Sequence, residues 1–253
     1  MDKNIVNGNF SRNAESYDDY AAVQRKCAEK LIGLIGEKPF SSILEIGCGT
    51  GIYTRLLHDR YGDAEITAVD ISEKMVEIAR EKLTGKNISF MIADGEQITP
   101  DGKLDLITSN ASFQWFENIE ETLELFTGAL ADGGMLCFSM YGPETFKEFR
   151  EVLGVHFGRH RGLSSGKFPS RKEMEGILKK YFRRFELTEE RFSSEFLSLW
   201  DFLRDVKKSG TRGEGLGGIF LGKYVIKELE KTYIERFGGI AATHHVYFCR
   251  AQV

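Results

Sequence analysis

The chain of 253 residues contains no run of about 18 apolar residues, so the sequence predicts no membrane-spanning helix. Its first twenty residues, MDKNIVNGNFSRNAESYDDY, lack the apolar core of a signal peptide. Cysteine is scarce, and the four that are present show no metal-ligand spacing: Cys27, Cys48, Cys137 and Cys249. We therefore expect reduced core cysteines, no bound metal and a cytoplasmic protein.

An excess of positive charge is also missing. The chain has 34 Lys and Arg residues against 38 Asp and Glu residues, which gives a net charge of -4. This balance argues against a general nucleic-acid-binding protein. Hydrophobic residues make up 42% and charged residues 28%, as in an ordinary globular protein, and the length suits one large domain or a domain with a cap.

Strand-like and helix-like segments alternate in the first part of the chain. We expect strands at 41–47, 65–70, 88–94, 104–110 and 135–142, and helices at 20–35, 52–62, 73–83 and 118–130, with Ser72 capping the third helix. Alternation of this kind predicts an α/β fold, in which a mostly parallel sheet carries helices on both faces.

The pattern loosens after Tyr141. Helices are expected at 143–157 and at 171–182, the latter capped by Ser170, and long strands at 182–196 and 240–251. Two helical segments and a Gly-rich loop, SGTRGEGLGG, separate these strands. The predicted organisation is an N-terminal helical segment (1–39) that closes the cofactor site, a core (40–196 and 239–253), and a helical cap (197–238) over the sheet edge where ligands bind.

The stretch LEIGCGTG, residues 44–51, forms the first strand-to-helix turn, which is the usual ligand site of an open parallel sheet. Its glycines, Gly47, Gly49 and Gly51, let the backbone approach a ligand and adopt positive φ. Their spacing differs from the G-x-G-x-x-G of dinucleotide sites. Glu45 would repel a pyrophosphate, but it suits a ligand that bears an ammonium and a sulfonium.

Polar residues end the following strands. Asp70 can accept two hydrogen bonds from a ribose diol, a feature shared by NAD and S-adenosylmethionine sites, and Ile71 follows it as a further cofactor-binding candidate. Asp94 and its neighbour Gly95 can meet an adenine amino group. Asn110 ends the fourth strand, where the amino-acid end of the ligand should lie.

With these motifs the chain resembles the class I S-adenosylmethionine-dependent methyltransferases over residues 40–142, in LEIGCGTG, VDIS, MIADGEQI and LITSNASFQW. It is further similar to the malonyl-carrier-protein O-methyltransferases of biotin synthesis in FSRNAESYDDYAAVQRKCAEKL, SNASFQWFENIEETL, FSMYGPETFKEF and DFLRDVKKSGTRG. The resemblance implies a Rossmann-like sheet with a helical cap between the last two strands. It also implies methyl transfer from S-adenosylmethionine to the free carboxyl of a malonyl thioester, carried by acyl carrier protein or coenzyme A.

A malonyl carboxylate is ionised at neutral pH, so this reaction needs no general base. The enzyme must orient the reactants, exclude water and hold the carboxylate, for which arginine is the usual residue. By the resemblance, Tyr17 closes over the methyl group, Gln114 and Trp115 line the transfer pocket, and Arg204 in the cap binds the carboxylate, with Arg212 as the next candidate. The plainer readings are a packed aromatic for Tyr17 and Trp115 and a solvated arginine for Arg204.

Acyl carrier proteins are acidic, so their docking face on this chain should be basic. Two clusters qualify: Lys207, Lys208 and Arg212, or Lys179, Lys180, Arg183 and Arg184. His244 and His245 are adjacent on the last strand and should face opposite sides, one exposed and one packed, with neither assigned to catalysis.

Three alternatives remain open at this point. They are a methyltransferase for another small carboxylate or a quinone-type substrate, a nicotinamide-dependent dehydrogenase, and a non-catalytic S-adenosylmethionine-binding protein. The G-x-G-x-G spacing and the lack of a catalytic donor constellation argue against the dehydrogenase. A turnover assay separates the non-catalytic protein from the enzyme.

Overall fold

The computed structural model describes residues 2–158, 163–210 and 221–253. The described residues form a seven-stranded sheet of order β3-β2-β1-β4-β5-β7-β6. The strands are β1 (Ser42–Ile46), β2 (Glu65–Asp70), β3 (Ile88–Ile92), β4 (Leu104–Asn110), β5 (Leu130–Tyr141), β6 (Arg184–Phe196) and β7 (Ile240–Gln252). Strands β1 to β5 are parallel, whereas β7 is antiparallel to both of its neighbours. The predicted Rossmann-like α/β fold is confirmed.

Helices cover both faces of the central strands, and successive strand residues pack into different clusters because they point to opposite sides. Ile43 belongs to an apolar cluster with residues of α3 (Ala22–Ile35) and α4 (Ile52–Arg60). Leu44, the next residue, belongs to a second cluster with α6 (Ile119–Ala129) and α8 (Arg171–Tyr181). Helix α5 (Glu73–Lys82) packs against β2 and β3.

Side-chain caps fix where two of these helices begin. The Ser72 hydroxyl accepts the Met75 amide at the start of α5. Ser170 and Glu173 form a reciprocal capping box at the start of α8. Both predicted caps are therefore confirmed.

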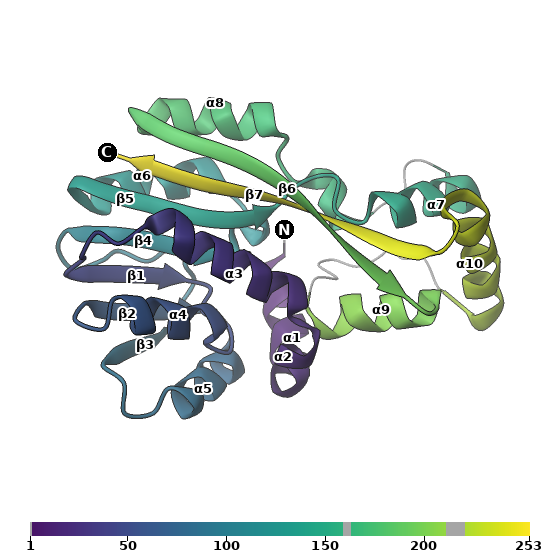
Figure 1. The fold of residues 1–253 in the computed structure, drawn as a ribbon, viewed down its shortest axis with the longest axis horizontal. Coiled ribbons are helices and arrows are strands. Elements are labelled where there is room, and N and C mark those ends of the chain that lie inside the picture. The colour runs from purple at the N-terminus through teal and green to yellow at the C-terminus, as the bar shows by residue number, and fades with distance from the viewer. Residues whose placement is uncertain (1, 159–162, 211–220) are drawn as a thin grey trace.

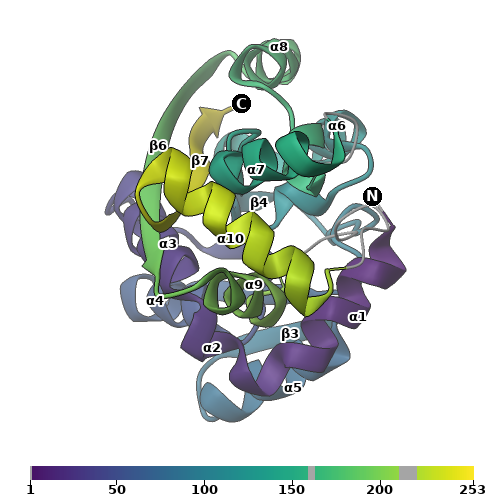
Figure 2. The ribbon, with the colours of Figure 1, turned by 90° about the vertical axis from the view of Figure 1, so that its right-hand side faces the viewer.

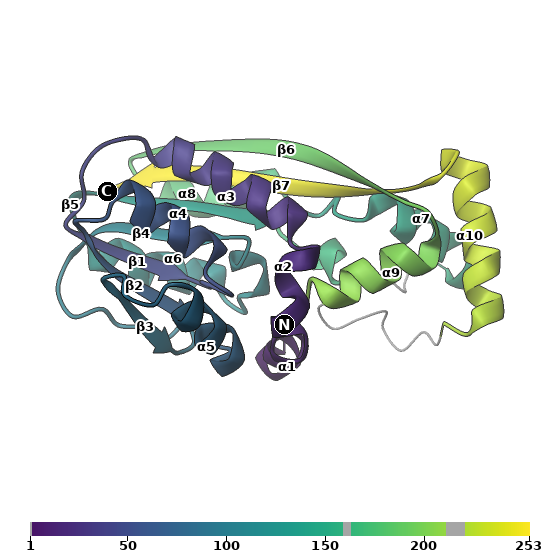
Figure 3. The same ribbon diagram turned by 60° about the horizontal axis from the view of Figure 1, so that its bottom comes forward.

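A third apolar cluster lies at one end of the molecule, on the right in Figure 1. It joins α7 (Lys147–Phe157), α9 (Leu199–Lys208) and α10 (Lys223–Phe237) to the first residues of β7. Strands β6 and β7 pair from Arg184↔Gln252 to Phe196↔Ile240 and so extend beyond the rest of the sheet (Figure 3). Helices α9 and α10 are inserted between these two strands, at the positions predicted from their sequence.

The N-terminal segment stands at the carboxyl ends of the parallel strands. It forms α1 (Lys3–Asn13) and α2 (Tyr17–Tyr20), which lie between the parallel strands and α9 in Figures 1 and 3. The Lys208 ammonium donates to the Ser16 hydroxyl at 3.4 Å and so ties α9 to this segment. None of the described helices is both long and apolar enough to cross a bilayer.

Candidate active site

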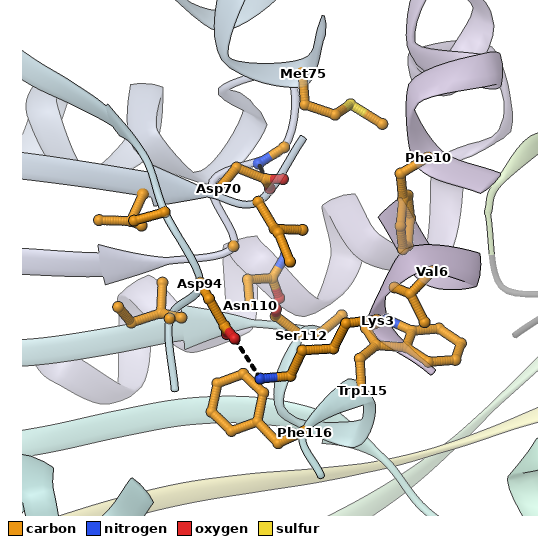
Figure 4. A pocket seen from close by; sticks show the side chains of 18 of the residues that line it. Lys3, Val6, Phe10, Asp70, Met75, Asp94, Asn110, Ser112, Trp115 and Phe116 are labelled. Carbon is orange, nitrogen blue, oxygen red and sulfur yellow. Dashed lines mark hydrogen bonds and ion pairs between the residues drawn. The ribbon is translucent and has the colours of Figure 1, made fainter. Parts of the chain in front are cut away.

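A pocket with an empty volume of about 740 Å³, which includes space open to solvent, lies at the carboxyl ends of β1, β2 and β4. Its size is that of a small-molecule site. Figure 4 shows Asp70, Asp94 and Asn110 at strand ends, facing Lys3, Val6 and Phe10 of α1. The pocket is thus formed jointly by the sheet and the N-terminal segment.

Two glycines of the first turn serve different purposes. Gly47 has φ 74°, and a Cβ there would lie 2.3 Å from the Ser112 hydroxyl, so it permits close packing. Gly49 has φ 55°, lines the pocket, and would place a Cβ in open space. A side chain at Gly49 would therefore enter the volume available to a ligand.

The Asp70 carboxylate is held in place by backbone donors. It accepts the Gly49 amide at 2.9 Å and the Ser72 amide at 2.8 Å. Burial raises the pKa of Asp70, and these hydrogen bonds only partly oppose that increase. The carboxylate therefore presents fixed acceptor oxygens to the pocket, as a ribose diol requires.

Asp94 is bound across the pocket by a residue that the sequence reasoning missed. The Lys3 ammonium of α1 donates to the Asp94 carboxylate at 2.5 Å and also forms an ion pair with Glu96 (Figure 4 shows the Asp94 contact). Glu96 in turn accepts the amides of Glu117 and Asn118 at 3.0 and 2.8 Å. The N-terminal helix is thereby anchored on the carboxylate predicted to meet adenine.

Glu45 is fully buried in β1, just before the glycine turn. Neither of its carboxylate oxygens has a hydrogen-bond partner of good geometry within the described ranges, and the Thr54 hydroxyl is close enough to lower the Glu45 pKa slightly. Burial outweighs this effect and raises the pKa of Glu45 to about 8. A cation bound nearby would lower this pKa and favour the ionised form, whereas an anion would raise it further.

Aromatic rings form the remaining wall. Phe10 lies with its ring centroid 6.1 Å from that of Tyr17 and 6.1 Å from that of Trp115. Burial, followed by the charge of Asp70, raises the pKa of Tyr17, so its phenol stays protonated. Tyr17 and Trp115 therefore line the pocket as predicted from the family resemblance, although their roles stay predictions.

Gln114 and Arg204 lie outside the pocket lining. Gln114 is buried, donates to the Ala111 carbonyl at 2.6 Å and accepts the Tyr141 amide at 3.2 Å, so it joins the turn after β4 to the end of β5. The Arg204 side chain is 60% exposed and forms an ion pair with Asp201 on the same helix. Their predicted contacts with substrate stay predictions.

The structure thus brings together most of the predicted cofactor-binding residues. Those that line the pocket are Gly47, Gly49, Asp70, Ile71, Asp94, Gly95 and Asn110. Glu45 and Gly51 do not: Gly51 precedes α4, with its Cα facing Ala79 and Leu83. Arg212 lies outside the described residues. Lining residues that sequence reasoning missed include Lys3, Val6, Phe10, Met75, Ser112 and Phe116; of these, Phe10, Ser112 and Phe116 fall within a recognised motif.

The expectation that one of the two adjacent histidines is exposed was wrong. His244 and His245 are 5% and 2% exposed, because β7 is an inner strand covered on both faces. His245 contacts Glu189 at 3.1 Å, and His244 packs against the rings of Tyr141 and Phe146. Among the described residues, no three His, Cys, Asp or Glu side chains gather as a metal site.

Comparisons with known proteins agree with this geometry. Residues 43–134 match a family described as a methyltransferase domain. A solved structure of the YcgJ protein from Bacillus subtilis superposes with a TM-score of 0.63 at 13% identity, covering 90% of this chain and 97% of that one. Phosphoethanolamine N-methyltransferase 2 of Haemonchus contortus, in complex with S-adenosyl-L-methionine, gives a TM-score of 0.59 at 16% identity, covering 95% of this chain and 57% of that one.

A similar curated protein spans nearly the whole chain. Malonyl-[acyl-carrier protein] O-methyltransferase 1 of Ilyobacter polytropus is 37% identical over 253 residues, covering 98% of this chain and 94% of that protein. Such identity over the full length exceeds what a shared fold alone requires. The chain belongs to the family of the malonyl-[acyl-carrier protein] O-methyltransferases.

Proposed function

We propose that the protein transfers a methyl group from S-adenosylmethionine to the free carboxyl of a malonyl thioester on acyl carrier protein, in the cytoplasm and as an early step of biotin synthesis. The relationship to malonyl-[acyl-carrier protein] O-methyltransferases over 98% of the chain carries this proposal. The pocket at the strand ends supports it independently.

The residues present fit S-adenosylmethionine. Asp70 would bind the ribose diol, and Asp94 the adenine amino group. The backbone at Gly47 and Gly49 would approach the amino-acid end, and its positive charges would favour ionisation of Glu45, which is buried just before the glycine turn. When bound, S-adenosylmethionine supplies a methyl group on a positively charged sulfur, whose transfer to a carboxylate oxygen forms a C–O bond, breaks the C–S bond and needs no proton transfer.

The chain itself must then position the acceptor and exclude water. We propose that residues 1–39 close the cofactor side of the pocket, since Lys3, Val6, Phe10 and Tyr17 all line it. The described parts of the predicted cap, residues 197–210 and 221–238, would cover the acceptor side. No histidine lines the pocket among the described residues, and the Tyr17 phenol stays protonated. The site therefore suits an acceptor that is already ionised better than a phenol of the quinone type, which needs a base.

Mass spectrometry of malonyl-acyl carrier protein after incubation with the enzyme and S-adenosylmethionine tests the proposal. The expected product carries one additional methyl group, and acetyl-acyl carrier protein, which lacks the carboxyl, should gain none. Methylation of both proteins, or of neither, would reject a malonyl carboxylate as the acceptor.

The cofactor site has a matched pair of variants. Gly49→Ala and Gly85→Ala both add a methyl at positive φ into space free of protein atoms, so their backbone strain should be similar. Only Gly49 lines the pocket. Steric overlap should weaken cofactor binding by about ten- to a hundred-fold in Gly49→Ala. Calorimetry should show unchanged cofactor binding in Gly85→Ala. Equal affinities in the two variants would show that the cofactor does not bind beside Gly49.

A further inference from the structure

A second, smaller cavity shares one wall with the cofactor pocket. Its empty volume is about 340 Å³, part of it open to solvent, and Trp115 lines both spaces. The other residues used below are Tyr141, at the end of β5, and Thr145, Ser164 and Ser165. A group in this cavity would therefore lie next to the pocket assigned to the methyl donor.

Two hydrogen-bond donors in this lining are unused. The Trp115 indole N–H and the Tyr141 hydroxyl are buried, and neither has a hydrogen-bond partner in the part of the chain that the structure describes. Buried polar groups in native proteins nearly always have partners, so two exceptions at one cavity call for a ligand. Indole only donates, and burial raises the pKa of Tyr141 well above its usual value, so the phenol keeps its proton. The complementary ligand is an acceptor such as a carboxylate.

Nearby polar groups are already engaged or turned elsewhere. The Thr145 hydroxyl donates to the His245 carbonyl at 3.1 Å, and the Ser165 hydroxyl donates to the Thr145 carbonyl at 2.7 Å. The Arg150 guanidinium, beside Gly166, donates to the Pro143 carbonyl at 2.6 Å and does not line the cavity. The Trp115 indole N–H and the Tyr141 hydroxyl are therefore the unpaired donors that this lining offers to an acceptor.

Neutral donors suit this reaction better than a guanidinium. Methyl transfer from a sulfonium to a carboxylate removes one positive and one negative charge, so the reactants are more polar than the transition state. An arginine fork would stabilise the charged carboxylate more than the transition state and would slow the transfer. Two neutral donors orient the carboxylate while leaving most of its charge to attract the cationic donor.

We infer that the acceptor carboxylate of the proposed reaction binds in the second cavity, on the Trp115 indole N–H and the Tyr141 hydroxyl, rather than on Arg204. This inference rests on the proposed function and names the residues that recognise its substrate. It also explains why the carboxyl-bearing thioester is selected: an acetyl thioester would leave both buried donors unpaired.

The Tyr141→Phe variant tests the inference with little risk to the fold, since the hydroxyl has no partner to lose among the described residues. Calorimetry in the presence of S-adenosylhomocysteine compares the binding of malonyl-acyl carrier protein with that of acetyl-acyl carrier protein. The wild type should prefer the malonyl form, and Tyr141→Phe should lose about ten- to a hundred-fold of that preference. Its melting temperature and its affinity for S-adenosylhomocysteine should stay unchanged.

Tyr61→Phe is the matched control. The Tyr61 hydroxyl is also buried in the core, but it donates to the Gly36 carbonyl and lines neither cavity. This variant should lower the melting temperature and keep the malonyl preference. Trp115→Phe, like Tyr141→Phe, should reduce the preference for the malonyl form over the acetyl form.

An undiminished preference in Tyr141→Phe, or an equal loss for the malonyl and acetyl forms, would overturn the inference. Neither result would affect the proposed function, provided that the wild type methylates malonyl-acyl carrier protein. Absence of both turnover and preference in the wild type would reject the proposed function and, with it, this inference.

Discussion

At the scale of single residues, Glu45 shows how far burial alone changes a side chain. Its carboxylate lies in the centre of the sheet without a hydrogen-bond partner in the described structure, and its pKa is about 8. Because this value lies above that of an unfolded glutamate, 4.5, the folded protein favours the protonated form. The stability that the proton provides is complete below about pH 4.5 and is lost as the pH rises through 8.

Glu45→Gln should therefore have a pH-dependent effect on stability. Near pH 5 the variant and the wild type should have similar free energies of unfolding, since both carry a neutral side chain of the same shape. Near pH 8.5 the variant should be more stable, by an amount on the order of 1–3 kcal/mol. Urea unfolding at the two pH values measures the difference, with the exposed Glu77→Gln as control. A variant less stable than the wild type at high pH would show that Glu45 is ionised and paired in solution.

The sequence predicts residues of the site well where each follows directly from a strand. Gly49, Asp70, Asp94 and Asn110 all line the pocket, because parallel strands end at one edge of the sheet. Arg204 shows where this reasoning stops. On α9 the buried residues are Leu199, Phe202 and Val206, and the rotation of the helix about its axis turns Arg204 outward. The spacing of these three residues already marks the packed face of the helix, whereas the position of α9 relative to the pocket depends on tertiary contacts that no local pattern reveals.

At the scale of elements, α1 is held by few contacts. Val6 is its one residue classed as buried, and the helix is mostly polar. Lys3, at its first turn, adds the ion pairs to Asp94 and Glu96, and Ser11 lies 2.8 Å from the Ser72 hydroxyl. The few contacts suit the closing role proposed for residues 1–39, in which α1 would move away when the cofactor exchanges.

Lys3→Met should therefore speed cofactor exchange. Without its ion pairs, α1 should open more often, and the dissociation rate of labelled S-adenosylmethionine should rise by about tenfold, a loss of roughly 1.4 kcal/mol in the closed state. Rapid filtration measures this rate. In the wild type, added salt should raise the rate as well, because it screens the ion pairs, whereas Lys3→Met should respond little.

Lys74→Met, at an exposed position of α5, removes the same charge and serves as the control. Dissociation rates that match in wild type and Lys3→Met would mean that α1 does not limit exchange.

Elements with strong periodic patterns were predicted closely, whereas α1 was expected only as part of a helical segment over residues 1–39, without bounds of its own. The strand β2 and the caps Ser72 and Ser170 occur where their residues indicate. Helix α1 carries Gly8 and several asparagines, residues of low helix propensity, so its pattern resembles a loop. Strand β5 begins at Leu130, not near Met135 as expected, because a register shift lets Leu130 pair with Leu104. The start of β5 therefore depends on a tertiary contact.

At the scale of the whole molecule, the two basic clusters proposed for carrier docking lie apart. Lys207 and Lys208 are on α9, next to the N-terminal segment and the pocket. Lys179 and Lys180 are on α8, on the far side of the molecule from α9 in Figures 1 and 2. A carrier that delivers a tethered thioester must dock near the pocket, so α9 is the better candidate.

Lys207→Glu should weaken activity on malonyl-acyl carrier protein more than on malonyl-coenzyme A. Reversing an exposed charge at a rim changes mainly the association rate, so kcat/KM for the carrier should fall by about three- to tenfold at low salt. The loss should shrink as salt is added. Lys179→Glu makes the same change on α8 and should leave both substrates unaffected. An equal loss of activity on the two substrates in Lys207→Glu would show that this lysine supports the fold and does not recognise the carrier.

The positions of the two tryptophans allow intrinsic fluorescence to report on two different parts of the molecule. Trp115 is 7% exposed in the wall shared by the two cavities, whereas Trp200 is 48% exposed on α9. The fluorescence of a buried indole lies at shorter wavelengths than that of a hydrated one, so the emission of the two tryptophans can be distinguished. Filling of the cavities should change the short-wavelength fluorescence of Trp115. Contact of a carrier with α9 should change the long-wavelength fluorescence of Trp200. Ligand entry and partner docking can thus be followed as separate events in a single unlabelled sample.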